Sequence, residues 1–159
     1  MRVGVVTVSD GVFHGHREDE SGRAICEIVQ RAGHVVASHR VVPDEMEAIE
    51  AALLGMVDEL DVDLVLTTGG TGVAPRDVTP EATRAILDKE VPGIPEAMRY
   101  HALAKSPRAM LSRAVAGVRK RTLIVNLPGS VRGVRESLEV IYPELEHAVA
   151  LIREQPVDH

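Results

Sequence analysis

The sequence predicts one α/β domain with three layers, in which helices cover both faces of a mostly parallel sheet. Apolar runs rich in β-branched residues alternate with segments whose apolar residues recur at helical spacing. Glycine-rich turns follow several of the apolar runs, as is typical where a strand leads into a helix. Because no linker, repeat or low-complexity segment divides the chain, we expect residues 1–159 to form a single domain.

The first half of the chain alternates strands with helices. In chain order we expect a strand at residues 2–8, a polar loop at 9–20, a helix at 21–32, a strand at 34–42 and a helix at 46–60. Gly33 marks the end of the first helix, since glycine readily adopts the left-handed conformation that closes many helices. Asp44 lies where an N-cap residue of the next helix is expected.

The second half predicts the rest of the sheet and its covering helices. We expect a strand at 62–66, helices at 79–89 and 94–105, strands at 112–118 and 121–126, and a last helical region at 130–154. A tight basic turn joins the last two strands, so they predict a hairpin that adds one antiparallel strand. Pro143 is expected to break the last helical region, because proline has no N–H to donate to the helix.

Composition excludes several classes of function. The net charge is −6, from 18 basic and 24 acidic residues, and no block of Lys or Arg occurs, which argues against nucleic acid as a main partner. The apolar runs are far shorter than the roughly 20 residues that span a bilayer. We therefore expect no membrane association and a cytoplasmic location. The single cysteine, Cys26, allows no intrachain disulfide or cysteine zinc cluster.

The most informative segment is residues 67–83, with the sequence TTGGTGVAPRDVTPEAT, which we call the signature loop. It follows the buried strand at 62–66 and ends at a helix start. Its glycines, Gly69, Gly70 and Gly72, let backbone N–H groups approach phosphate oxygens near a helix N-terminus. Asp77 would repel such a phosphate unless a cation lay between them. The segment therefore indicates a site for a Mg²⁺-bound nucleotide.

Four segments with glycines or polar side chains, which we call the marked segments, are expected at the carboxyl ends of strands. They are Ser9-Asp10, Asp44, residues 69–77 and residues 128–130. Ligands of open α/β sheets bind outside these strand ends. We therefore expect the four segments to meet at one edge of the sheet, although they lie far apart in sequence.

These residues closely resemble the molybdenum-cofactor adenylyltransferase family, which includes bacterial MogA and MoaB, plant homologues and the gephyrin G domain. The signature loop carries most of the resemblance, which extends over nearly the whole chain. Further matching segments are VTVSD at 6–10, VPDE at 42–45, LSRAVAG at 111–117 and LPGS at 127–130. Many members have proline where Val131 stands, which leaves the shape of that turn open.

The resemblance implies a MogA/MoaB-like molybdopterin-binding domain that transfers AMP from Mg-ATP to the terminal phosphate of molybdopterin and releases pyrophosphate. It implies that Asp77 and Asp44 are the catalytic, metal-binding carboxylates. Asp44 could instead orient the substrate. The resemblance further implies a substrate-binding set: Ser9, Asp10, Gly69, Gly70, Thr71, Gly72, Ser112, Arg113, Pro128, Gly129 and Ser130.

Simpler interpretations remain open from the residues alone. Asp44 and Asp77 could cap helices, Arg113 could be a solvated strand residue, and Ser9 and Asp10 could only form a turn. The alternative function is a non-catalytic pterin- or nucleotide-binding or scaffold member of the same fold. Turnover of molybdopterin and Mg-ATP distinguishes the two.

The resemblance also implies self-association as a homotrimer, or as a hexamer built from trimers. Residues 91–110 add a physical argument, because they carry large apolar side chains among few charges: Ile94, Pro95, Met98, Tyr100, Leu103 and Met110. This segment could alternatively pack on its own sheet. A later-step molybdenum-insertion enzyme is a further partner that the resemblance implies.

Overall fold

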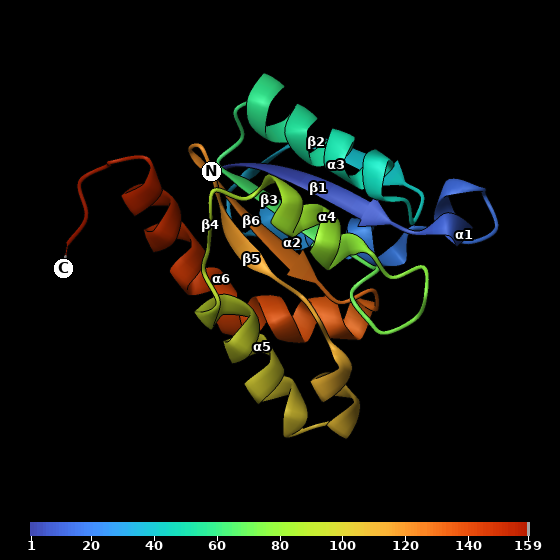
Figure 1. The fold of residues 1–159 in the computed structure, drawn as a ribbon. Coiled ribbons are helices and arrows are strands. Elements are labelled where there is room, and N and C mark those ends of the chain that lie inside the picture. Colours follow the sequence, from blue (N-terminus) through green and yellow to red (C-terminus); the bar gives the residue numbers. More distant parts are fainter. Residues whose placement is uncertain (159) are drawn as a thin grey trace.

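A computed structural model describes residues 1–158 and shows a six-stranded sheet between two layers of helices (Figure 1). The strands lie in the order β2 (Val35–Val42), β1 (Arg2–Val8), β3 (Leu64–Thr68), β6 (Thr122–Leu127), β5 (Ala116–Arg119) and β4 (Lys89–Glu90). β2, β1, β3 and β6 are parallel, whereas β5 is antiparallel to both of its neighbours. The predicted three-layer α/β/α fold, with one reversed hairpin strand, is confirmed.

One face of the sheet is covered by α2 (Glu20–Arg31), α5 (Gly93–Leu103) and α6 (Val131–Ile152). Alternate residues of the strands, such as Val5 and Leu66, pack against Ile25 of α2 and Leu138 of α6, and all four are buried. Aliphatic side chains make up this core, in agreement with an aromatic content of only 2%. Burial of each such side chain stabilises the fold by about 1.5–3 kcal/mol.

The opposite face is covered by α3 (Met46–Leu54), the π-helical segment η1 (Gly55–Glu59) and α4 (Thr79–Ile86). Here the intervening strand residues, including Val6 and Val65, pack against Leu53 and Met56. Because neighbouring strand residues point to opposite faces, every central strand is buried on both sides. That arrangement fixes the sheet register and hence the relative positions of the strand ends.

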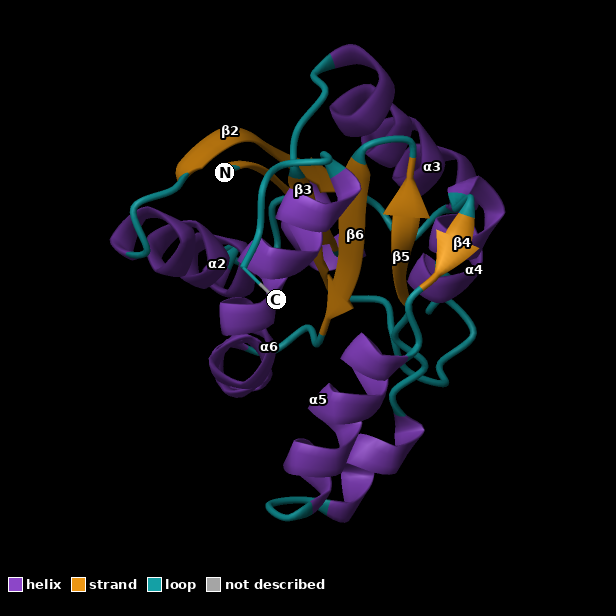
Figure 2. Cartoon of the chain, turned by 90° about the vertical axis from the view of Figure 1, so that its left-hand side faces the viewer, coloured by secondary structure: helices purple, strands orange, loops and turns teal. Residues whose placement is uncertain are grey.

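A smaller helical part projects beyond the sheet (Figure 2). It consists of α5 and the short 3₁₀ helix η2 (Pro107–Leu111), which leads back into β5. Tyr100 and Met110 are largely exposed there, at 77% and 64% of their surface, whereas Met98 is 5% exposed and belongs to the core. The segment 91–110 therefore packs on its own sheet through Met98 and Ile94 but still presents apolar side chains outward.

Several element boundaries differ from the predictions. The expected loop at 9–20 contains a short helix α1 (Asp10–Phe13), and α2 begins at Glu20, where the Asp19 carboxylate caps it by accepting the Gly22 N–H. The helix expected at 79–89 ends at Ile86, and Lys89 belongs to the edge strand β4 instead. The strand expected at 112–118 begins only at Ala116.

The expected break at Pro143 is wrong, because α6 is continuous through it. The proline ring is on the exposed side of the helix, while Leu138, Ile141 and Leu145 before and after it are buried on the sheet. The hydrogen bond that proline removes is one whose carbonyl partner, on Glu139, also faces solvent. Packing of the apolar face thus outweighs the lost bond.

None of the helices within residues 1–158 combines the length and the apolar character needed to cross a membrane.

Candidate active site

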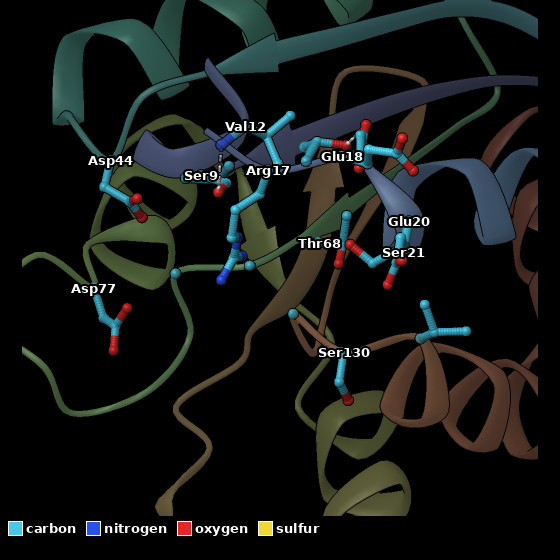
Figure 3. Close-up of a pocket in the computed structure, with 17 residues that line it drawn as sticks. Ser9, Val12, Arg17, Glu18, Glu20, Ser21, Asp44, Thr68, Asp77 and Ser130 are labelled. Carbon is cyan, nitrogen blue, oxygen red and sulfur yellow. Dashed lines mark hydrogen bonds between the residues drawn. The ribbon is translucent and has the colours of Figure 1, made fainter. Parts of the chain in front are cut away.

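The four marked segments meet at the carboxyl ends of β1, β2, β3 and β6, as the topology predicts. They line a cavity of about 710 Å³ (Figure 3). The predicted site residues among its lining are Ser9, Asp44, Gly69, Gly70, Asp77, Gly129 and Ser130. The first turns of the long helices α2 and α6 contribute Ser21 and Val131, so two helix N-termini face the cavity. Such termini favour bound anions.

The signature loop needs glycine at two of its positions. Gly69 and Gly70 have positive φ values of 98° and 69°, a region that side chains other than glycine rarely adopt. A Cβ on Gly69 would also collide with the Val8 carbonyl oxygen, and one on Gly70 would collide with the Thr79 hydroxyl. The backbone of the loop therefore passes directly over the end of β1.

Thr79, the buried first residue of α4, holds this conformation. Its hydroxyl donates to the Gly69 carbonyl at 2.9 Å, and its N–H donates to the Gly70 carbonyl at 3.1 Å. The Gly69 N–H donates to Leu127, whereas the Gly70 N–H has no hydrogen-bond partner within the described residues 1–158. Gly70 thus lines the cavity with a free donor, as a phosphate cradle requires.

The second glycine turn lies directly against the first. A Cβ on Gly129 would come within 3.3 Å of the Gly69 Cα atom, and the Thr68 hydroxyl donates to the Pro128 carbonyl at 2.6 Å. Ser130 then caps α6 by accepting the Gly133 N–H. Val131 occupies the first turn of α6, where proline is also favoured. Although Val131 replaces the proline of many family members, the turn before it is therefore an ordinary capped helix start.

Asp10 and Asp44 hold the ends of β1 and β2 together. The N–H of each residue donates to the carboxylate of the other, at 2.9 and 3.0 Å. Arg76 of the signature loop adds two hydrogen bonds to Asp10, at 2.8 and 2.9 Å. Asp10 itself lies behind the cavity wall rather than among its lining. The expected N-cap role of Asp44 is wrong, because Glu45 occupies the cap position and makes no side-chain cap bond.

The carboxylates of Asp10 and Asp44 have opposite electrostatic environments. The Arg76 guanidinium, helped by the Asp44 N–H, lowers the pKa of Asp10 below its usual value. Burial raises the pKa of Asp44, and the negative charges of Asp10 and Asp77 raise it further. The Asp44 charge is thus poorly compensated by the protein, and a cation at the cavity wall would compensate it.

Asp77 faces the same region of the cavity as Asp44 (Figure 3). One of its oxygens accepts the Ala74 N–H at 3.0 Å, which fixes the side chain within its own loop. It caps no helix, since Val78 is the N-cap of α4 and provides no side-chain bond. Two carboxylates, from loops 33 positions apart in the chain, therefore converge at one wall.

Arg113 lies outside this cavity, and its donors are used within the protein. It donates to both oxygens of Glu81, at 2.6 and 2.9 Å, and to the carbonyls of Gly72 and Asp77, each at 2.7 Å. Its own N–H donates to Thr71, which is 8% exposed. In this conformation Arg113 and Thr71 support the signature loop from behind.

A second cavity of about 560 Å³ adjoins the first and shares Ser130 with it. The remaining predicted residues, Gly72, Ser112 and Pro128, line this second cavity, between α5, η2 and the start of α6. Four basic side chains and one acidic side chain line it: Arg99, Lys105, Arg108 and Arg132, and the acid Glu136. A basic and an acidic cavity thus lie side by side.

The loop at 14–19 was missed as part of the site. Arg17, Glu18 and Asp19 line the first cavity together with Glu20. Asp19 accepts hydrogen bonds from Thr7 at 2.7 Å and from His39 at 2.9 Å, which ties the loop to β1 and β2. The available signal was the charged run after Gly15, in a loop that follows a strand directed at the site.

Together the fold and the site define an α/β protein with a cavity at the carboxyl edge of its sheet, where glycine turns and helix N-termini suit phosphorylated ligands. Residues 4–147 match the family model described as a probable molybdopterin binding domain, and the chain belongs to this family. The predicted membership is confirmed.

Relatives of known name and structure cover nearly the whole chain. Molybdopterin adenylyltransferase of Helicobacter pylori is 44% identical over 154 residues, which cover 96% of this chain and 88% of the relative. The crystal structure of the molybdopterin biosynthesis enzyme MoaB from Thermus thermophilus has 53% identity and a TM-score of 0.92, over 99% of both chains. The Mog protein from Mycobacterium ulcerans has 41% identity and a TM-score of 0.90, over 95% of this chain and 98% of that one.

Proposed function

We propose that this protein is a molybdopterin adenylyltransferase, which transfers AMP from Mg-ATP to the terminal phosphate of molybdopterin and releases pyrophosphate. The observation that carries the proposal is the pair Asp44 and Asp77, two carboxylates at the wall of a cavity that two glycine turns and two helix N-termini also line. The names of the relatives, which are similar over most of the chain, support the same reaction.

The donor set fits a divalent cation bound together with the nucleotide. Within residues 1–158 no group of three or more His, Cys, Asp or Glu side chains is arranged to hold a metal ion. Mg²⁺ commonly binds one or two carboxylates and completes its shell with substrate phosphates and water. Asp44, whose charge is poorly compensated, and Asp77 would hold such an ion. When bound, Mg²⁺ neutralises charge on the polyphosphate.

The reaction requires positioning rather than proton transfer by a side chain. A phosphate oxygen of molybdopterin forms a bond to the α-phosphorus of ATP, and the bond to the bridging oxygen of the β-phosphate breaks. The electron pair leaves with pyrophosphate. Because the nucleophile is already an anion at neutral pH, no general base is needed. The free N–H of Gly70 and the N-termini of α2 and α6 supply fixed positive dipoles to the phosphates.

The two adjoining cavities suit the two substrates. The acidic cavity, with Ser9, Gly69, Gly70 and Gly129, receives the nucleotide with its cation. The basic cavity, with Ser112, receives the anionic pterin, whose phosphate meets the nucleotide beside Ser130. Asp10 and Arg113, whose side chains are engaged by Arg76 and by Glu81, hold the segments around the site in position.

Turnover tests this proposal against a non-catalytic scaffold. The protein is incubated with molybdopterin and Mg-ATP, and pyrophosphate and adenylylated pterin are measured. Release of both products in equal amounts is the expected result. Binding of both substrates without any pyrophosphate would support the scaffold function instead.

We also propose a homotrimer, or a hexamer of trimers, and a cytoplasmic location. Tyr100, Leu103, Met110 and Leu111 form the exposed apolar patch on α5 and η2 that supports self-association. A molybdenum-insertion enzyme that accepts the adenylylated pterin is the further partner implied by the reaction, since the product is an activated intermediate.

A further inference from the structure

The first cavity is strongly acidic for a site that receives a polyphosphate. Its lining carries five carboxylates, from Glu18, Asp19, Glu20, Asp44 and Asp77, and a single cationic side chain, that of Arg17. A divalent cation at Asp44 and Asp77 would offset only part of this charge. The lone guanidinium is therefore the fixed positive group available to a bound polyphosphate in this cavity.

Arg17 has no partner within the protein, despite these acidic neighbours. No hydrogen bond or ion pair to its side chain occurs among residues 1–158, whereas Arg76 is paired with Asp10 and Arg113 with Glu81. Figure 3 shows the guanidinium of Arg17 directed into the open cavity, between Asp44 and Asp77 on one side and Ser130 on the other. An unpaired guanidinium in this position is free to bind an anion.

The backbone holds Arg17 in this place. The N–H groups of His16 and Arg17 both donate to the Gly11 carbonyl, at 2.8 and 3.2 Å. Gly15, with a φ of 78°, allows the chain to turn back toward α1. The stem of Arg17 then lies over Gly11, where a Cβ would come within 3.3 Å of Arg17 Nε. The loop thus places the base of the Arg17 side chain at the cavity.

We propose that Arg17 binds the polyphosphate of the nucleotide, on the side of the cavity opposite the carboxylates of Asp44 and Asp77. This inference rests on the proposed adenylyl transfer. A guanidinium offers two parallel N–H donors that match a pair of phosphate oxygens. When the bond between the α-phosphorus and the bridging oxygen breaks, negative charge develops on the leaving pyrophosphate. Arg17 stabilises that charge, while the cation acts from the other side.

The test compares Arg17→Met with Arg23→Met. Arg23 is an exposed residue of α2 outside the cavity, so its substitution removes the same charge nearby without touching the site. Titration calorimetry with Mg-ATP and with AMP should show affinity for Mg-ATP weakened by about tenfold or more in Arg17→Met, as expected for charge-assisted hydrogen bonds. The affinity for AMP should stay within about twofold of the parent value, since AMP lacks the β- and γ-phosphates, and Arg23→Met should change neither. Arg17→Lys should recover part of the loss.

Unchanged Mg-ATP affinity in Arg17→Met would overturn the inference, and so would an equal loss of AMP and Mg-ATP affinity. The inference and the proposed function fail separately. A protein that binds Mg-ATP through Arg17 but forms no adenylylated pterin contradicts only the reaction. A protein that turns over and binds Mg-ATP without help from Arg17 contradicts only the role of Arg17.

Discussion

Asp10 and Asp44 exchange backbone-to-carboxylate hydrogen bonds across two strand ends that are 34 residues apart in the chain. In this pair the Asp10 carboxylate has a structural role, whereas the Asp44 carboxylate remains available to a ligand. Arg76 matches the charge of Asp10, while the charge of Asp44 stays poorly compensated beside Asp77. The consequence is a rigid wall that carries a negative charge suited to a cation.

Asp77→Asn should abolish turnover and leave the protein folded. The asparagine oxygen can still accept the Ala74 N–H, so the signature loop keeps its shape. Loss of a metal-binding charge should slow pyrophosphate release by about two orders of magnitude or more. Asp58→Asn, far from the cavity, is the matched control and should retain turnover. Near-parental pyrophosphate release by Asp77→Asn would refute the role assigned to Asp77.

Asp44→Asn should also remove most of the turnover, but it should not lower thermal stability at neutral pH. Because Asp44 caps no helix, the loss of about 0.5–2 kcal/mol that follows removal of an N-cap is not expected. Pyrophosphate release and thermal melting of the same preparation check both parts. If the variant melted at a lower temperature but kept full activity, Asp44 would have only a structural role.

The pH dependence of these two aspartates should have opposite signs. Folding raises the pKa of Asp44, so its charged form costs stability above the folded pKa, and the cost disappears below the unfolded value of 3.8. Folding lowers the pKa of Asp58 to about 2 through Arg119 and Lys120, so its contribution is present above 3.8 and is lost toward about 2. At neutral pH the melting temperatures of Asp44→Asn and Asp58→Asn should therefore differ from that of the parent protein in opposite directions. In acid the three melting temperatures should converge. Parallel deviations would contradict the assigned environments.

Gly70→Val should weaken Mg-ATP binding more than molybdopterin binding. Valine at a φ of 69° is strained, and its Cβ would press on Thr79 and come within 3.1 Å of an Asp44 oxygen. Gly33→Val is the control, because Gly33 has a similar φ of 84° and open space around it. We expect the control to lose stability without losing ligand affinity. Equal loss of both ligands in Gly70→Val, measured by calorimetry, would argue against a nucleotide cradle at Gly70.

The exposed apolar patch should mediate self-association. Light scattering at micromolar concentration should give a mass near three or six times that of the 17.2 kDa chain. A double variant, Tyr100→Glu with Met110→Glu, changes only exposed side chains and should yield a folded monomer. Leu151→Glu, at a similarly exposed position on α6, should keep the parental mass. A monomeric parent protein would exclude the oligomer.

The sequence predicts the layers and the meeting of distant segments well, because both follow from the periodicity of buried residues. Val5 and Leu53, for example, lie on the faces that their spacing indicates. The helix at 131–152 was predicted with a break at Pro143, although the spacing of Leu138 and Leu145 indicates one apolar face, because the sequence does not show how strongly packing of that face stabilises a continuous helix. Local rules therefore fail where tertiary packing outweighs them.

The candidate site was predicted where backbone constraints leave a sequence signal. Gly69 and Gly70 are such positions, since their conformation excludes other residues. The side-chain orientation of Arg113 could not be predicted from the sequence, because it depends on Glu81 and on carbonyl groups that only folding brings close. Arg17 was missed because it lies in a polar loop whose course depends on hydrogen bonds to the Gly11 carbonyl and on contacts of Asp19 that form only in the folded chain.

The contact between Gly69 and Gly129 restricts how this site can change. Val8, Gly69 and Gly129 meet through backbone atoms alone, so this contact has no side chain whose size or charge could be varied. Substitution of one glycine would displace the partner turn, and the effects of two such changes should be strongly non-additive. A change toward another phosphorylated substrate, by evolution or by design, is therefore expected in the loop at 14–19 and in the lining of the second cavity, where side chains can be substituted without displacing the two glycine turns.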